Sequence, residues 1–174
     1  MKDILVLSHC ILNNAAKVSQ DESLLSEEYE QRKRLLGLAL DKGVQLLQLP
    51  CPEFMLYGSR RFGHVKDQFM HPRFIRESEE MLKPMFDQME EYSSYPGDFR
   101  IIGVISVEGS PSCGSRLTCR ADWKGEICSL PDEPVMANEP GVFMEIIIDG
   151  IGKRGLDIPV VTMEEAIGIM ENLK

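Results

Sequence analysis

The eight residues RIIGVISV, at positions 100–107, decide the fold of this chain. They form a nearly continuous apolar run dominated by isoleucine and valine, which is typical of a strand buried on both faces of a parallel sheet. A polar, turn-prone segment, GSPSCGS at 109–115, follows at once. The run therefore predicts a central strand and places Cys113 just past its carboxyl end, not inside the sheet.

Three further strands are predicted from shorter apolar runs, at residues 4–8, 44–50 and 158–163. Between the strands lie stretches with helical spacing, at residues 27–43, 71–92, 141–155 and 163–174. Gly43 is expected to stop the first of these helices, and Pro84 to kink or divide the second. Residues 120–134 predict a short hairpin or ordered loop that turns near Gly125.

Strands that alternate with helices predict βαβ units and a parallel sheet. We expect one α/β domain over residues 1–174, a small Rossmann-like or flavodoxin-like three-layer sandwich. Its mainly parallel sheet should have about four strands in the order 2-1-3-4. The loops at 13–27 and 54–71 are long for a compact domain, which predicts that they form the walls of a pocket.

Composition narrows the class of function. Of the 174 residues, 43% are hydrophobic and 27% are charged, as in ordinary globular proteins. The formal charge of −9 and the absence of a Lys/Arg block argue against binding a nucleic-acid polymer. No apolar run approaches the roughly 20 residues needed to cross a bilayer. The five cysteines are an odd number without an export signal, so we expect a cytoplasmic protein with reduced thiols and no membrane partner.

Cys10, Cys51 and Cys113 each follow a predicted strand within a few residues of its carboxyl end. Ligands bind at this edge of an open α/β sheet, where adjacent strand ends lie about 4.8 Å apart. A single such cysteine is best interpreted as a small buried hydrophobe, but three at equivalent positions favour a shared site. Soft thiolates suit an iron–sulfur cluster, zinc or copper(I), and the paired spacing of structural zinc sites is absent among these three.

These motifs resemble the thiouracil desulfidase family, in which a cysteine follows the first strand, CPE the second and SPSCG the third. The counterparts here are SHCILNN, PCPEF and GSPSCGS. The resemblance implies a 4Fe-4S cluster held by Cys10, Cys51 and Cys113, with one iron not bound by protein. It also implies a small thio-compound as substrate: this iron binds the thiocarbonyl sulfur, water attacks the carbon, and sulfide leaves without net redox change.

The resemblance further assigns Glu53 and Ser110 to catalysis. Glu53 is the glutamate of CPE, and a carboxylate beside an apolar pocket can have its pKa raised toward neutrality, which suits a proton carrier. Ser110, the first serine of SPSCG, would bind substrate or orient water, with Ser112 as second choice. Plainer interpretations are a helix-start charge for Glu53 and turn caps for the serines.

After CPE the chain departs from the family, whose members continue with GGL and a proline-rich arginine motif; residues 54–69 here read FMLYGSRRFGHVKDQF. Arg60 and Arg61 can pair with an anionic substrate or face solvent. Two alternatives to a desulfidase stay open. One is a non-catalytic iron–sulfur or zinc-binding module, for electron transfer or as a partner subunit, and the other is a cysteine- or zinc-dependent hydrolase.

Overall fold

A computed structural model describes residues 1–126, 128 and 133–173. Its main sheet has four parallel strands in the order β2-β1-β3-β6. The strands are β1 (Lys2–Leu7), β2 (Gln45–Gln48), β3 (Phe99–Ile105) and β6 (Val160–Val161). Counted along the chain, these strands follow the order 2-1-3-4, so the predicted α/β topology is confirmed.

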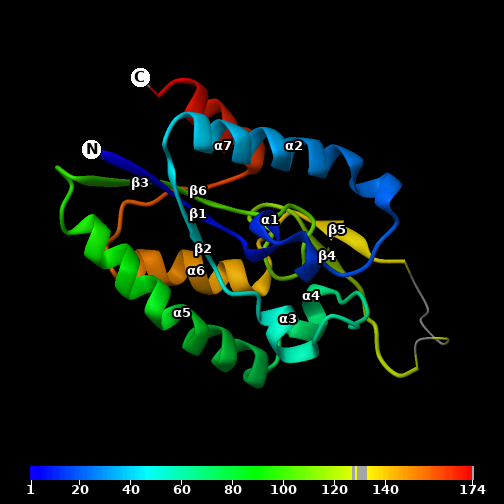
Figure 1. The fold of residues 1–174 in the computed structure, drawn as a ribbon. Coiled ribbons are helices and arrows are strands. Elements are labelled where there is room, and N and C mark those ends of the chain that lie inside the picture. Colours follow the sequence, from blue (N-terminus) through cyan, green and yellow to red (C-terminus); the bar gives the residue numbers. More distant parts are fainter. Residues whose placement is uncertain (127, 129–132, 174) are drawn as a thin grey trace.

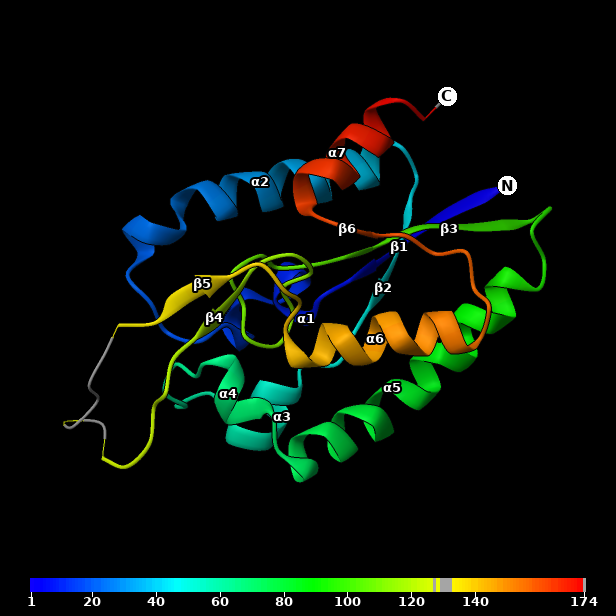
Figure 2. The ribbon, with the colours of Figure 1, turned by 180° about the vertical axis from the view of Figure 1, so that it is seen from behind.

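Helices cover both faces of this sheet, as Figures 1 and 2 show from opposite sides. One face carries α2 (Glu22–Asp41) and α7 (Met163–Glu171). The other face carries α5 (Pro72–Ser93) and α6 (Val142–Lys153). The result is the expected three-layer, Rossmann-like or flavodoxin-like sandwich.

The two central strands supply most of the sheet's core. Residues 4–7 of β1 and 101–105 of β3 are all buried, as expected for parallel strands with helices packed on both faces. The helices close the core with large apolar side chains, among them Leu35, Leu82, Met89, Phe143 and Met170.

Short elements fill the carboxyl edge of the sheet. The helical ones are α1 (His9–Leu12), the 3-10 helix η1 (Asn14–Ala16), α3 (Pro52–Tyr57) and α4 (Lys66–Phe69). An antiparallel pair, β4 (Thr118–Arg120) with β5 (Val135–Ala137), lies beside them. Of these pieces, η1, α4 and part of α3 lie in the loops at 13–27 and 54–71, where the sequence predicts a pocket.

Two expectations about helix ends have different outcomes. Gly43 follows the end of α2 with a φ of +68°, so the predicted glycine stop is confirmed. Pro84 does not divide α5, which runs unbroken across it. The physical reason is that Pro84 is exposed, while Leu82 and Met85 are buried on the core side and hold the flanking turns in place.

The segment expected as a hairpin, 120–134, is flanked by the antiparallel strands β4 and β5, which pair with each other. Gly125, where the turn was expected, has a φ of +85°. Residues 127 and 129–132 of that expectation lie outside the described residues. The last helix ends at Glu171, before the predicted end at 174, which is also outside them. Throughout the described part of the chain, every helix is too short or too polar to traverse a lipid bilayer.

Candidate functional site

A cavity of about 390 Å³ opens at the carboxyl ends of β1, β2 and β3. Residues 16–20, between α1 and α2, form part of its wall. Residues 61, 63 and 64, between α3 and α4, form another part. The prediction that the two long loops are pocket walls is therefore confirmed.

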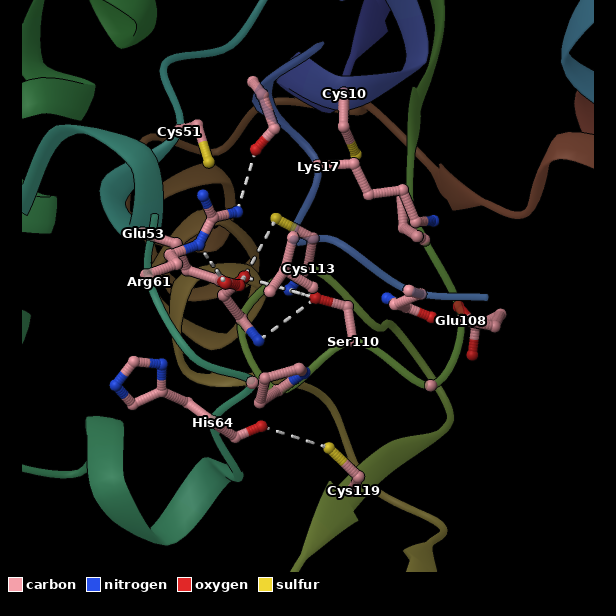
Figure 3. A pocket seen from close by; sticks show the side chains of 18 of the residues that line it. Cys10, Lys17, Cys51, Glu53, Arg61, His64, Glu108, Ser110, Cys113 and Cys119 are labelled. Atoms are coloured by element: carbon pink, nitrogen blue, oxygen red, sulfur yellow. Dashed lines mark hydrogen bonds and ion pairs between the residues drawn. The ribbon is translucent and has the colours of Figure 1, made fainter. Parts of the chain in front are cut away.

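The cavity brings together the three cysteines that the sequence singled out. Cys10 comes from α1, Cys51 immediately precedes α3, and Cys113 follows β3. Figure 3 shows their sulfur atoms pointing toward a common space. A fourth cavity cysteine, Cys119 of β4, lies apart from them and donates a hydrogen bond from Sγ to the His64 carbonyl at 3.6 Å.

All three strand-end thiols are held in their neutral form by their surroundings. Burial raises the pKa of Cys10 to about 11, although Lys17 acts in the opposite direction. Burial also raises the pKa of Cys51, against the Phe54 N–H and the charge of Arg61. The pKa of Cys113 lies well above its ordinary value, first because of burial and then because of Cys10. Binding a thiophilic metal group here would release protons.

The candidate metal donors at the cavity are the thiols of Cys10, Cys51 and Cys113. Among the described residues, no three His, Cys, Asp or Glu side chains are grouped closely enough to hold a single metal ion. Three soft thiols around one cavity are the donors that a thiophilic metal group would use.

Glu53 sits beside these thiols, buried in the first turn of α3. Its Oε1 accepts a hydrogen bond from the Ser112 hydroxyl at 2.5 Å, and its Oε2 lies 3.3 Å from Arg61 Nε. Ser112 Oγ is also 3.4 Å from Cys113 Sγ. One hydroxyl therefore separates the carboxylate from the thiol, an arrangement in which a proton can pass between neighbouring groups.

The two serines have different surroundings. Ser110 Oγ accepts hydrogen bonds from the backbone N–H groups of Ser112 and Cys113, at 3.3 and 3.1 Å, so it caps the turn as in the plainer interpretation. Ser110 also lines the cavity, and its Oγ lies 3.2 Å from Ser112 Oγ. Ser112, the second choice from the sequence, is the serine that contacts Glu53.

Glu108 fixes the loop that carries Cys113, a role that sequence reasoning missed. Its carboxylate accepts hydrogen bonds at 2.7 to 3.1 Å from the hydroxyls of Ser106 and Ser115 and from the N–H groups of residues 115–117. Burial raises the pKa of Glu108, but these bonds, led by the Ser115 N–H, more than offset that effect and hold it below its ordinary value.

The start of α6 clamps the same loop from the other side. The backbone N–H groups of Val142 and Met144 donate to the carbonyls of Pro111 and Ser112, at 3.0 and 2.9 Å. A Cβ at Gly141 would lie 2.6 Å from the Ser112 carbonyl carbon. The signal for this contact in the sequence is a glycine at the start of a predicted helix, a position where glycine is common whatever it packs against.

The histidines occupy three different settings. His64 lines the cavity and packs against the rings of Tyr57 and Phe69, with centroids 4.9 Å away in each case. Burial lowers the pKa of His64, partly opposed by Glu53. His9 also lines the cavity, and its Nδ1 lies 3.0 Å from the Leu49 carbonyl oxygen. His71 instead caps α5 by accepting from the Phe74 N–H at 3.3 Å.

Comparison with known proteins gives one distant likeness. No protein-family description matches this chain, and no solved structure matches it. An uncharacterized protein, MJ0003 of Methanocaldococcus jannaschii, is 28% identical over 115 residues, which cover 64% of this chain and 67% of the archaeal protein. Its name states no activity, so the function has to be inferred from the residues of the site.

Proposed function

We propose that this protein is an iron–sulfur-dependent desulfidase that hydrolyses the C–S bond of a small thiocarbonyl compound, such as a thiouracil, and releases sulfide. The supporting observation is the convergence of three thiols from three strand ends on one cavity beside a buried carboxylate. Cys10, Cys51 and Cys113 would hold a 4Fe-4S cluster and leave one iron without a protein ligand.

When bound, the cluster would supply a Lewis acid that polarises the C=S bond. The chain's own residues would manage the proton of the attacking water. Glu53 Oε1 is the acceptor, because it already receives a hydrogen bond from the Ser112 hydroxyl. A water proton can reach it directly or through Ser112 Oγ, and the carboxyl can later return that proton. Ser110 keeps the Ser112 backbone in place through the turn that it caps.

Anaerobic reconstitution tests the cluster. Iron, sulfide and zinc should be quantified, with an absorption spectrum, for the wild type, Cys113→Ala and Cys128→Ala. About four irons and four sulfides are expected in the wild type and in Cys128→Ala, whose cysteine is exposed, but not in Cys113→Ala. One zinc without iron in the anaerobic wild type would contradict the proposal.

The proton-carrying role is tested on variants that keep the cluster. Glu53→Gln should lower the rate of sulfide release from thiouracil by about 10²-fold or more, since general acid–base groups contribute effects of that order. Ser112→Ala should cost more than Ser110→Ala, because only Ser112 contacts the carboxylate. A Glu53→Gln variant as fast as the wild type would remove Glu53 from the mechanism.

A further inference from the structure

Arg61 is the most completely buried cation at the cavity, with a side chain only 3% exposed. Each of its three nitrogens has a protein acceptor. Nε lies 3.3 Å from Glu53 Oε2, Nη1 donates to the Gly58 carbonyl at 3.2 Å, and Nη2 donates to the Ala16 carbonyl at 2.8 Å. The guanidinium therefore points at protein acceptors, and Arg61 does not face solvent, which was one of the two expectations from the sequence.

One of these bonds joins segments that are distant in sequence, because Ala16 is 45 residues before Arg61, whereas Glu53 and Gly58 are eight and three residues before it. Ala16 belongs to η1, in the loop that follows β1, and Gly58 ends α3, which follows β2. Arg61 itself lies in the loop between α3 and α4. One side chain thus ties both walls of the cavity to each other and to the carboxylate of Glu53.

Glu53 needs this partner for physical reasons. Its residue is only 9% exposed, and a buried carboxylate is stable only when it is paired and hydrogen-bonded. Ser112 satisfies Oε1, and Arg61 satisfies Oε2. With both oxygens engaged, the carboxylate cannot rotate away from the serine.

We infer that Arg61 is the positioning residue of this site: it directs the Glu53 carboxylate at Ser112 and locks the two loops over the cysteine cavity. The first half of this inference rests on the proposed function, since it concerns a catalytic carboxylate. The second half holds for the metal-free protein and can be measured without any activity.

The loop-locking role is tested by thiol alkylation. Metal-free, reduced wild type, Arg61→Ala, Arg61→Lys and Arg60→Ala are treated with iodoacetamide, and each cysteine is followed by mass spectrometry. Buried Cys113 is the reporter, exposed Cys128 is the internal reference, and circular dichroism verifies that each variant is folded. Arg60 is the matched control, because it neighbours Arg61 but is exposed.

Loss of the charged hydrogen bonds in Arg61→Ala should speed Cys113 alkylation about tenfold or more relative to Cys128. The rate of Cys113 alkylation in Arg61→Lys should lie between those of the wild type and Arg61→Ala. One ammonium cannot reach all three acceptors as the fork of a guanidinium does. Arg60→Ala should match the wild type. The inference fails if Arg61→Ala protects Cys113 as the wild type does, or if Arg60→Ala exposes it equally.

The positioning of Glu53 is tested on the reconstituted enzyme. Arg61→Ala should lower kcat for sulfide release about tenfold or more with little change in KM, and Arg61→Lys should recover part of the loss. A higher KM with unchanged kcat would instead make Arg61 a substrate-binding residue. If the wild type releases no sulfide, the proposed function fails, while the alkylation result still decides whether Arg61 locks the loops.

Discussion

Two loops meet over the cavity, and they are held in different ways. The loop at 106–117 is fixed from both sides, by the Glu108 carboxylate and by the backbone at the start of α6. In the loop at 58–64, Arg61 bonds to Glu53 and to Ala16, and the His64 carbonyl accepts a hydrogen bond from Cys119 Sγ at 3.6 Å. Cys113 and Ser112 are therefore positioned by the fold, whereas the link from the opposite wall to Glu53 and Ala16 depends on a single guanidinium.

A glycine-to-alanine substitution in each of the two loops should give the largest difference in the free energy of unfolding. In Gly114→Ala the new Cβ would lie 2.1 Å from the Leu117 carbonyl oxygen, so backbone must move, whereas no atom lies within 4 Å of a Cβ at Gly63. Gly114→Ala should lower the free energy of unfolding by about 3 kcal/mol or more. Gly63→Ala should change it by less than about 0.5 kcal/mol. Urea denaturation measures both, and equal midpoints would refute the contrast.

The raised thiol pKa of Cys10 gives a second prediction, for the metal-free protein. The thiolate is the reactive form, so a pKa of about 11 in place of 9.0 leaves less of it at any lower pH. At pH 8, iodoacetamide should modify Cys10 about a hundredfold more slowly than a thiol of ordinary pKa. The rate should climb about tenfold per pH unit and level off only near the raised pKa. A plateau reached near pH 9 would show that burial does not control this thiol.

Glu108→Gln should lower the free energy of unfolding, because Glu108 holds the loop at 106–117. The lowered pKa of Glu108 fixes the direction in which this loss changes with pH. Because the pKa of Glu108 is lower in the folded state, its contribution is present above the ordinary value of 4.5 and is lost as pH falls below it. At pH 7 the substitution should cost about 1–2 kcal/mol, a figure reduced because the residue is exposed. The cost should shrink below pH 4.5. Urea unfolding at pH 7 and pH 3.5 checks this, and a constant difference would contradict it.

Local sequence signals predicted the fold because they coincide with its physical requirements. The run at 100–107 is apolar since β3 is buried on both faces, and Gly43 marks a helix end since a positive φ is needed there. The cysteines were placed correctly at strand ends for the same reason: parallel order alone brings those ends to one edge. The coming together of the three thiols at one cavity followed from topology.

The partners within the site could not be predicted in this way, because they are distant in sequence. Ser112 meets a glutamate 59 residues earlier, and Arg61 meets a carbonyl 45 residues earlier. Nothing in their local patterns distinguishes Ser112 from Ser110, or Arg61 from Arg60. Only the packing of the loops selects one of each pair. The role of Glu108 was hidden for a related reason, since most of its partners are backbone N–H groups, which every sequence supplies.

The smallest predicted effect concerns the other cavity wall, where Lys17 forms an ion pair with Glu28. Lys17 lowers the pKa of Cys10 and Glu28 raises it. In the metal-free protein at pH 8, Lys17→Gln should therefore slow Cys10 alkylation and Glu28→Gln should speed it, each by about two- to fivefold, since the charges are partly screened. The opposite signs make the test specific. If breaking the ion pair merely loosened the wall, both variants would accelerate the reaction, which would contradict an electrostatic effect of Lys17 and Glu28 on the Cys10 thiol.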